Sequence, residues 1–592
     1  MRAERGLWAG LFALLVLSLA ARLAPIRHGH GTSYVPDTHV VRCALGMAKE
    51  KSLAPPSGRY SSYPYLLPYL LLPVYAGQYG LGRVQGDWHG AEEYAQVIAA
   101  DPWRVHLPAR VLLACLAALA PLFLWLLLRE AGLGAGAWFG AVLCATCLLH
   151  VHHSTQERPW APLITAMAAC AWLSARYVRT GRLRELVWAG VAAGAAVSMH
   201  QGGLGAAFLP MVAWFIVLLR QTPKPWASML RGGVACGLAF LAVALLVGYP
   251  DRIVHGAPEH VVMQDQIEGT AHLTLGGQST VFGVRWSNFP HLGRILFGYD
   301  PALVLLGLAG FAAFLRNAKA RPLALFTLVW AAYFMTNVND HVRYLLPVAL
   351  GLAAGAGFLG EALWRHRAGR AVMALAVLVS LVQVARLDLL LNRPDTRADL
   401  RQALSTLPPD SDTALDLFAG ELPLDAVSLE RVASLRELYS REAMRLERLR
   451  AAVERDPGVR ALPLENVVRL LPREHATSLV PKFKAQWGAD LAGLMKDLGL
   501  SHIALVDDRP GDPRSELLLD DAPADSNDLS QQGPPWKQPP LKLRALTLPA
   551  PMLEITPGSS ARAQLPLAMD FPLIDLWKVD RPGPQIRLYV LP

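Results

Sequence analysis

Long apolar runs separated by short polar connections dominate the chain as far as residue 388. Each run is near the length that an α-helix needs to cross about 30 Å of hydrocarbon. The pattern therefore predicts an α-helical, polytopic membrane protein. We expect about eleven transmembrane helices, at residues 7–24, 109–128, 133–150, 159–175, 186–199, 203–219, 232–249, 300–315, 322–338, 343–362 and 371–388.

The connections between these runs alternate between strongly basic and nearly uncharged. The set that begins with the N-terminus carries sixteen Lys and Arg residues, whereas the short connections of the opposite set carry only Arg158 and Arg343. Basic residues favour the cytoplasmic side of a membrane. We therefore expect a cytoplasmic N-terminus and, because eleven is odd, an extracytoplasmic C-terminal part. A cleaved signal peptide is the alternative for residues 7–21, which have a basic start and an apolar core.

One further uncharged run, YPYLLPYLLLPVYAGQYGLG at residues 63–82, would invert this pattern if it crossed the membrane. It holds three prolines, which weaken a helix, and five tyrosines, which favour the headgroup level. We expect it to lie in or near the outer interface, within a long outer loop at residues 25–108. A second long outer loop is expected at residues 250–299.

The chain after residue 388 has a different pattern. Apolar positions recur at helical spacing in residues 425–454, and GADLAGLMKDLGLSHIALVDD at 488–508 is typical of a helix, a turn and a strand. These features predict an extracytoplasmic α/β domain at residues 389–592, following a transmembrane domain at 1–388. This domain contains no nucleophile elbow, phosphate loop or zinc motif.

Composition agrees with a membrane protein and argues against two other classes. Of the 592 residues 53% are hydrophobic, and the net charge is +9. Because basic residues are expected beside membrane spans, this charge does not indicate nucleic-acid binding. Ion-coupled transporters usually place ionisable groups or broken helices near the midplane, whereas the interiors of these runs are almost free of charge.

Polar residues with chemical potential gather instead where the runs end on the predicted outer side. Arginine binds phosphate well because its planar fork can hold two oxygens. A carboxylate beside a phosphate can take the proton of an attacking hydroxyl. These residue types therefore suit a substrate with a lipid tail, a phosphate and a transferable polar group. They occur at Asp37, His39 and Arg42, in HHSTQERPW at 152–160, at His200, and in NVNDHVRY at 337–344.

The order of several short motifs resembles the C-type membrane glycosyltransferases (GT-C fold), in the protein mannosyltransferase and aminoarabinose transferase group (glycosyltransferase family 39-like). An acid follows the first span, and a Pro- and Tyr-rich stretch similar to the family's PPL segment comes next. The motifs are Pro36-Asp37-Thr38, YPYLLPYLLLP, STQERPW at 154–160 (close to SQEaRxY), HVRYLLP at 341–347 (close to RYLLP), and the chain end GPQIRLYVLP.

This resemblance implies a glycosyltransferase that moves a sugar from a polyprenyl-phosphate donor to an acceptor hydroxyl, with inversion. The resemblance implies two catalytic residues, Asp37 and Glu157. Asp37 matches the catalytic acid, as the base that activates the acceptor, and Glu157 matches the second-loop acid, which orients the site or, in some members, helps a metal or acceptor. Arg343 would hold the donor phosphate, with Arg158 beside it. The sequence departs from the family pattern at two places. Thr38 follows Asp37 where many members have Glu. Ser61, Ser62 and Tyr63 stand where some members have Lys, and Arg59 would replace that Lys. His39, Arg42, Tyr63 and His200 are the expected substrate-binding residues.

The resemblance also implies the partners and the place of action. The donor is a polyprenyl-phosphate-linked sugar, the acceptor is a lipid, a glycan or a protein, and the site is the outer face of a bacterial cytoplasmic membrane. No cofactor is expected, because the histidines show no HxxxH or HExxH spacing, and a divalent metal is kept as the alternative. The rival functions are a transporter or flippase of lipid-linked glycans, and a non-catalytic envelope scaffold.

Overall fold

The computed structural model of the chain describes most of its membrane part and a smaller share of the residues after 388. The described residues are 2–30, 39–55, 63–220, 226–255, 271–275, 278–282, 284, 286–337, 342–415, 422–434, 447, 449–450, 453, 457–463, 496, 498–507, 550–558 and 576–591.

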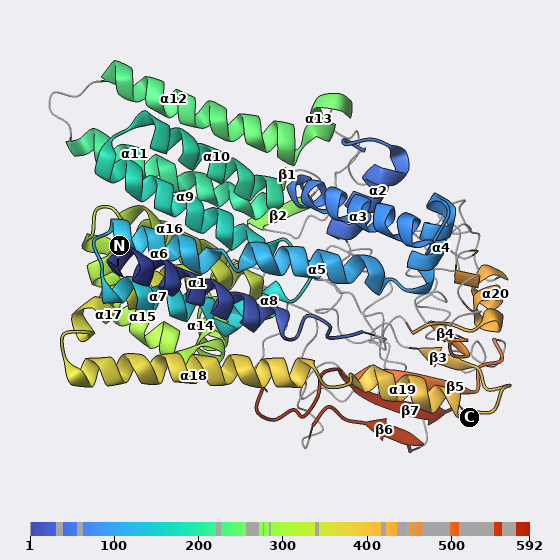
Figure 1. Ribbon diagram of the computed structural model, residues 1–592. Coiled ribbons are helices and arrows are strands. Elements are labelled where there is room, and N and C mark those ends of the chain that lie inside the picture. The colour runs from blue at the N-terminus through green and yellow to red at the C-terminus, as the bar shows by residue number, and fades with distance from the viewer. Residues whose placement is uncertain are drawn as a thin grey trace.

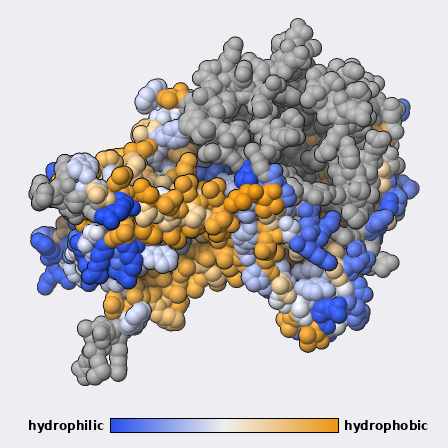
Figure 2. Space-filling view, turned by 90° about the horizontal axis from the view of Figure 1, so that it is seen from above, coloured by the Kyte–Doolittle hydropathy of each residue, from blue (hydrophilic) through white to orange (hydrophobic). Residues whose placement is uncertain are grey.

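A bundle of long helices forms the body of the molecule, and Figure 1 shows most of them running in a common direction. On the face that Figure 2 shows, apolar side chains cover the middle of the bundle, and hydrophilic ones gather toward both ends. The helices are α1 (Arg2–Leu23), α5 (Trp103–Ala117), α6 (Ala120–Glu130), α7 (Ala135–Ala145), α8 (Leu148–Ser154), α9 (Trp160–Thr180), α10 (Leu183–Met199), α11 (Phe208–Arg220), α12 (Trp226–Val243), α15 (Pro301–Arg316), α16 (Arg321–Phe334), α17 (Leu346–Leu363) and α18 (Arg367–Leu391).

The chain is a multi-pass membrane protein, as the apolar runs predicted. Within the described residues, seven helices are long and apolar enough to cross a membrane, or up to nine if two bent pairs each count as one span. Each of the eleven predicted spans overlaps a helix or two consecutive helical segments. Those at 186–199 and 322–338 correspond to α10 and α16, which have 17 and 14 residues and are not among the helices long enough to span. The predicted number of spans is therefore not established, whereas the places of the helices are.

Small residues let α17 pack closely against its neighbours at the centre of the bundle. A Cβ atom added at Gly310 of α15 would lie 1.9 Å from the carbonyl oxygen of Gly355. One added at Gly136 of α7 would lie 2.1 Å from the carbonyl oxygen of Gly357. Association of membrane helices depends on such close backbone contact because lipid offers no hydrophobic driving force.

Two membrane helices are broken, and charged side chains supply partners for the backbone at one break. α7 and α8 meet at 48°, while α14 (Asn288–Tyr299) and α15 meet at 115°. At the first break Arg22 donates to the carbonyl of Ala145 (3.0 Å), and the carboxylate of Asp300 accepts from the amide of Leu148 (2.9 Å). Buried backbone groups need such partners, above all within a membrane. The break is thus a fixed feature that directs α8 toward the polar residues after it.

The segment between α1 and α5 lies beyond one end of the bundle. It contains α2 (His39–Glu50), α3 (Leu66–Gln85) and α4 (Ala91–Ala100). α3 is not among the helices long and apolar enough to cross a membrane, and Figure 1 shows it running beside α5 past the ends of α9 and α10. Tyr75 holds it there by donating to the carbonyl of Val105 (2.9 Å). This agrees with the prediction that residues 63–82 do not span.

Shorter elements complete the same end of the bundle. The amide of Tyr65, just before α3, donates to the carbonyl of Gly248 (3.0 Å), which ties α3 to the short π-helix that follows α12. The other elements are the 3₁₀ helices η1 (Gln201–Ala207) and η3 (Val342–Leu345), the π-helix η2 (Ala244–Gly248), α13 (Pro250–His255), and an antiparallel pair of strands, β1 (Ala271–Leu275) and β2 (Gln278–Phe282).

The C-terminal part contains helices and a mixed sheet, in agreement with the predicted α/β character. α19 (Thr396–Ser405) and α20 (Ala426–Ser434) accompany five strands in the order β4-β3-β5-β7-β6. The first three strands of this order are parallel, and β7 and β6 are antiparallel to their neighbours. Arg386 of α18 donates to the carbonyls of Leu576 and Val579 and so links this part to the bundle. The strands are β3 (Thr413–Leu415), β4 (Ala461–Pro463), β5 (His502–Asp507), β6 (Leu553–Ile555) and β7 (Gln585–Val590).

Candidate active site at the polar end of the bundle

The predicted site residues that the structure describes lie at one end of the bundle, which we call the polar end. Here α1 and α10 end, whereas α5, α9 and α17 begin. Glu157 bonds to Arg110 of α5, and the ring of Tyr63 contacts that of His200. These contacts join connections that were predicted to lie on the outer side, so these connections meet at one end of the bundle. Asp37 and Arg59 lie outside the described residues, so their predicted roles stay predictions.

Glu157 is held by two side chains of α5. The carboxylate accepts from Nε of Arg110 (3.0 Å) and from Nδ1 of His106 (2.5 Å). Arg110 also donates to the carbonyl of His28 (2.8 Å), and its guanidinium lies 4.4 Å from the ring centroid of Trp103. The glutamate and Arg110 are fully buried. The negative charge of Glu157 is therefore compensated by side chains of α5, and not by an ion pair with the adjacent Arg158.

This arrangement favours a positioning role for Glu157. Both carboxylate oxygens accept hydrogen bonds from α5, and the side chain is fully buried, so the carboxylate is not exposed to a substrate in this arrangement. The ion pair instead fixes residues 155–159 against α5 and the end of α1. Arg158 lies within this stretch and Trp160 follows it, so we expect the orientation of both to depend on this anchor.

A continuous chain of ring contacts links segments that are far apart in sequence. The ring centroids of His39 and Tyr63 lie 5.2 Å apart, those of Tyr63 and His200 5.3 Å, and those of His200 and Trp160 4.2 Å. The ring of Trp160 is in turn 5.4 Å from that of Tyr344. The structure thus brings together three of the predicted substrate-binding residues.

Arg343 borders the same ring cluster. Its guanidinium carbon lies 5.8 Å from the ring centroid of Trp160 and 5.7 Å from that of Tyr344. Contact with aromatic faces orients a guanidinium and leaves its N–H groups directed along its plane. Arg343 and Arg158 are both partly exposed. Arg42 is exposed on α2, and no contact in the described part of the chain joins it to this cluster.

His200 is a neutral side chain in this cluster. Its Nδ1 accepts from the amide of Gly202 (2.9 Å), so the proton of the neutral ring is on Nε2. Burial holds the pKa of His200 well below its usual value, and the positive charges of Arg343 and Arg158 lower it further. The site therefore combines two permanent cations with an uncharged imidazole.

The three histidines of α8 differ in their partners, and the charges of Arg158 and Arg343 act on His153. His150 accepts from Arg22 (2.7 Å) and donates to the carbonyl of Ala161 (3.2 Å). His152 lies 3.3 Å from both the amide of Gln156 and the hydroxyl of Tyr299. Both ring nitrogens of His153 are buried without a hydrogen-bond partner. Among the described residues no three His, Cys, Asp or Glu side chains form a group that could hold a metal.

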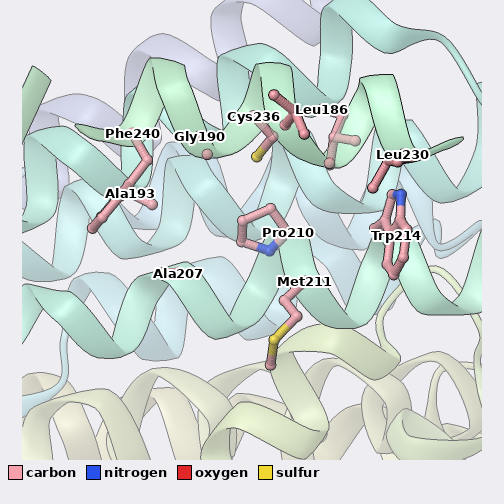
Figure 3. A pocket seen from close by; sticks show the side chains of 13 residues that line it. Leu186, Gly190, Ala193, Ala207, Pro210, Met211, Trp214, Leu230, Cys236 and Phe240 are labelled. Carbon is pink, nitrogen blue, oxygen red and sulfur yellow. The ribbon is translucent and has the colours of Figure 1, made fainter. Parts of the chain in front are cut away.

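An apolar groove of about 380 Å³ lies between α10, α11 and α12, away from the polar cluster. Figure 3 shows Leu186, Ala193, Pro210, Met211 and Trp214 around it. No charged side chain lines it, so it suits a hydrocarbon chain and not a sugar or a phosphate.

Several residues of the site were not predicted from the sequence. His106 and Arg110 lie within or beside an apolar run, and a single arginine near the end of such a run usually indicates an interfacial anchor. Trp160 and Tyr344 belong to motifs that were singled out, but only their charged neighbours were assigned roles. Their aromatic character beside Arg158 and Arg343 was the available signal.

No protein-family model matches the chain, and no characterised protein matches it in sequence. Solved structures to which it is similar include the oligosaccharyltransferase AglB of Archaeoglobus fulgidus in complex with an inhibitory peptide and a dolichol-phosphate (TM-score 0.48, 12% identity, 84% of this chain and 69% of that one). ArnT of Cupriavidus metallidurans, bound to undecaprenyl phosphate, has a TM-score of 0.42 and 14% identity over 86% of this chain and 82% of its own.

The S. cerevisiae protein O-mannosyltransferase Pmt1-Pmt2 complex, bound to its sugar donor, is similar over a smaller part: TM-score 0.30, 19% identity, 42% of this chain and 34% of that one. The resemblance to membrane glycosyltransferases that the sequence motifs show thus recurs among the structural neighbours. Likenesses as weak as these assign the chain neither a substrate nor a reaction.

Proposed function

We propose that this protein is a glycosyltransferase that moves a sugar from a polyprenyl-phosphate donor to the hydroxyl of a lipid, glycan or protein acceptor. The reaction takes place at the outer face of a bacterial cytoplasmic membrane, with the N-terminus in the cytoplasm and the C-terminal α/β part outside. The observation that carries the proposal is the cluster of Tyr63, His200, Trp160 and Arg343 at the polar end of an apolar helix bundle.

The phosphate of the donor binds Arg343 and Arg158 in this proposal. Both arginines are near His200, whose pKa their charges lower after the larger effect of burial. Paired guanidinium groups at a membrane surface suit a phosphate because each can form charge-assisted hydrogen bonds with two oxygens. Arg59, which is outside the described residues, is kept as a third candidate on the resemblance alone.

The sugar lies against the aromatic side chains, which combine apolar faces with polar edges. Trp160 and Tyr63 flank the imidazole of His200, at centroid distances of 4.2 and 5.3 Å. Because His200 is neutral, its Nε2–H is a hydrogen-bond donor that suits a sugar hydroxyl. His39 extends the same surface toward the acceptor side.

Asp37 acts as the base. In the sequence it precedes His39, a member of the ring cluster, by two residues. Asp37 takes the proton of the acceptor hydroxyl while the oxygen of that hydroxyl attacks the anomeric carbon. The bond between that carbon and the phosphate oxygen breaks, polyprenyl phosphate leaves with the electron pair, and a single displacement inverts the anomeric centre.

The tail of the donor, a methyl-branched hydrocarbon, suits the apolar groove between α10, α11 and α12. α10 joins the two places, because Ala193 lines the groove and His200 follows the last residue of the helix. A chain of polyprenyl type extending from a phosphate at the polar end can follow α10 into the groove.

The broken helices give the transporter alternative its one structural argument, since transporters place binding sites at such breaks. At the break between α7 and α8, however, Arg22 and Asp300 are committed to backbone groups. The carbonyl of Ala145 and the amide of Leu148 are therefore already bonded within the protein and are not open to an ion or a solute.

The deciding experiment compares wild type with Asp37→Asn, each purified and reconstituted in lipid. The assay follows loss of sugar from a panel of radiolabelled polyprenyl-phosphate sugars, with cell-envelope extract as the acceptor. Asp87→Asn is the control, because Asp87 is an exposed acid on the same predicted outer segment. We expect transfer by wild type and the control but not by Asp37→Asn.

Other results have distinct meanings. Transfer by all three proteins would keep the enzyme and remove Asp37 as the base. Absence of transfer by any of them, with lipid-linked sugar still bound, would replace the enzyme with a non-catalytic binding protein.

A further inference from the structure

His153 combines complete burial with a lack of hydrogen-bond partners. Its side chain is fully buried, and neither Nδ1 nor Nε2 has a partner. A buried polar group without a partner destabilises a fold, and most such groups in proteins are satisfied. An apolar side chain of similar size at this position would avoid that cost. The imidazole at this place therefore calls for a reason other than packing.

The neighbouring histidines make the contrast clear, since all three lie within one turn of the same helix. His150 has hydrogen-bond partners for both ring nitrogens, and His152 has neighbours within 3.3 Å of both. His153, whose ring centroid is 5.4 Å from that of His152, has neither. Its nitrogens are thus not part of the network that holds α8 in place.

The surroundings of His153 are cationic. The positive charges of Arg158 and Arg343 both act on its imidazole, as does the ring of His152. Arg158 and Arg343 are partly exposed, whereas His153 is fully buried. A buried imidazole without hydrogen-bond partners, on which the charges of two arginines act, is complementary to an anion that brings its own acceptor oxygens.

We propose that His153 binds the phosphate of the lipid-linked donor by donating one ring N–H to a phosphate oxygen held between Arg158 and Arg343. The inference rests on the proposed function, because that function supplies the lipid-linked phosphate. The other ring nitrogen, which is an acceptor in the neutral imidazole, receives a hydrogen bond from a hydroxyl of the same ligand. His153 is a binding residue in this role and takes no part in proton transfer.

The test measures binding and not turnover, so that it is independent of the reaction. Wild type, His153→Leu and His153→Asn are placed in phosphatidylcholine nanodiscs and titrated with undecaprenyl phosphate, with dissociation constants read from intrinsic tryptophan fluorescence. The melting temperature of each ligand-free protein is recorded as well. His366→Leu is the matched control, because His366 is exposed and lies between α17 and α18, at the opposite end of the bundle.

We expect the dissociation constant of His153→Leu to rise at least tenfold, and that of His153→Asn, which keeps an N–H donor, to stay within threefold of wild type. The ligand-free melting temperature of His153→Leu should equal or exceed that of wild type, because no partner is lost. Affinity unchanged in His153→Leu would overturn the proposal. So would a fall in its ligand-free melting temperature equal to that caused by His152→Leu, which does lose partners.

Two further titrations identify the source of the phosphate. Inorganic phosphate and phosphatidylglycerol nanodiscs replace undecaprenyl phosphate, and the effect of His153→Leu should be absent from both. An effect on either of these alone would overturn the assignment to the donor. Binding of undecaprenyl phosphate that depends on His153, in a protein that transfers no sugar, would leave this inference standing while the proposed reaction fails.

Discussion

Arg110 Nε lies 3.0 Å from Glu157 Oε1, and both side chains are fully buried although 47 residues separate them in the chain. Burial of two charges is unfavourable unless they neutralise each other, and removal of one partner leaves the other without compensation. The pair therefore acts as an obligatory link between α5 and the residues that lead into α9.

Glu157→Gln should destabilise the protein by about 3–5 kcal/mol, because it leaves the charge of Arg110 buried and unpaired. Thermal unfolding in detergent is the measurement, with Arg110→Met and the double variant completing a double-mutant cycle. The double variant should be less destabilised than the sum of the single ones. Additive effects would show that the two residues act independently.

Glu130→Gln is the matched control for that cycle. Glu130 pairs with Arg179 at the other end of the bundle, where the arginine side chain is 46% exposed. Exposed ion pairs contribute about 0–1 kcal/mol. The stability of this variant should therefore stay close to that of wild type.

Stability should fall as the pH drops below about 6.5, the ordinary pKa of histidine in an unfolded chain. The pKa of His200 in the folded protein is lowered, chiefly by burial and then by Arg343 and Arg158. The unfolded chain therefore binds a proton at pH values where the folded protein does not, and acid favours unfolding. Protonation would also break the bond that Nδ1 accepts from Gly202.

His200→Asn isolates this contribution. Asparagine can still accept from the amide of Gly202 as a helix-capping residue, but it does not titrate. Melting temperatures at pH 7.5 and 5.5 should differ less in this variant than in wild type. An equal difference in the two proteins would exclude His200 as a source of acid sensitivity.

Gly237→Leu should weaken binding of long-tailed donors without loss of stability. Gly237 lines the apolar groove, and a Cβ added there meets nothing within 4 Å, so the new side chain fills the groove without a clash. Affinities for polyprenyl phosphates of different chain length provide the measurement. The affinity for an undecaprenyl compound should fall several-fold and that for a farnesyl compound should stay unchanged.

The control for the groove is Gly298→Leu in α14, where the added Cβ also meets nothing within 4 Å. This variant should bind both chain lengths as wild type does. Equal weakening of both chain lengths by Gly237→Leu would show that the groove does not hold the tail.

Arg343→Lys should raise the KM for the donor about tenfold with a smaller effect on kcat. A lysine keeps the positive charge but lacks the planar fork that lies over Trp160 and Tyr344 and can hold two phosphate oxygens. Initial-rate kinetics with a polyprenyl-phosphate sugar would measure both constants. Unchanged KM in Arg343→Lys would limit the role of Arg343 to anchoring the protein at the interface.

The positions of the helices could be predicted because lipid imposes a simple demand on sequence. A span must be apolar over its whole length, so runs such as 159–175 coincide with helices such as α9. The contacts inside the bundle obey a different rule. Arg22 and Arg110 are fully buried and bind backbone carbonyls and Glu157, and such partners lie tens of residues away in the chain. Sequence spacing carries no signal for contacts at that separation.

The candidate site shows the same division. His39, Tyr63, His200 and Arg343 could be proposed because each is a polar residue at the predicted outer end of an apolar run, and the structure places them in or beside one cluster. The sequence also indicated Glu157 but not its environment. His106 and Arg110 of α5 bind its carboxylate and determine what that carboxylate can do. Asp37, the proposed base, remains a prediction from the resemblance.

The position of β7 in the C-terminal sheet has a consequence for biogenesis. β7, at residues 585–590, is the last strand along the chain, yet it lies inside the sheet between β5 and β6. β6 has no other strand partner within the described residues. The sheet can therefore close only after residues 585–590 have been synthesised. A polypeptide that stops before residue 585 exposes an unpaired edge of β5, the feature that invites aggregation and proteolysis.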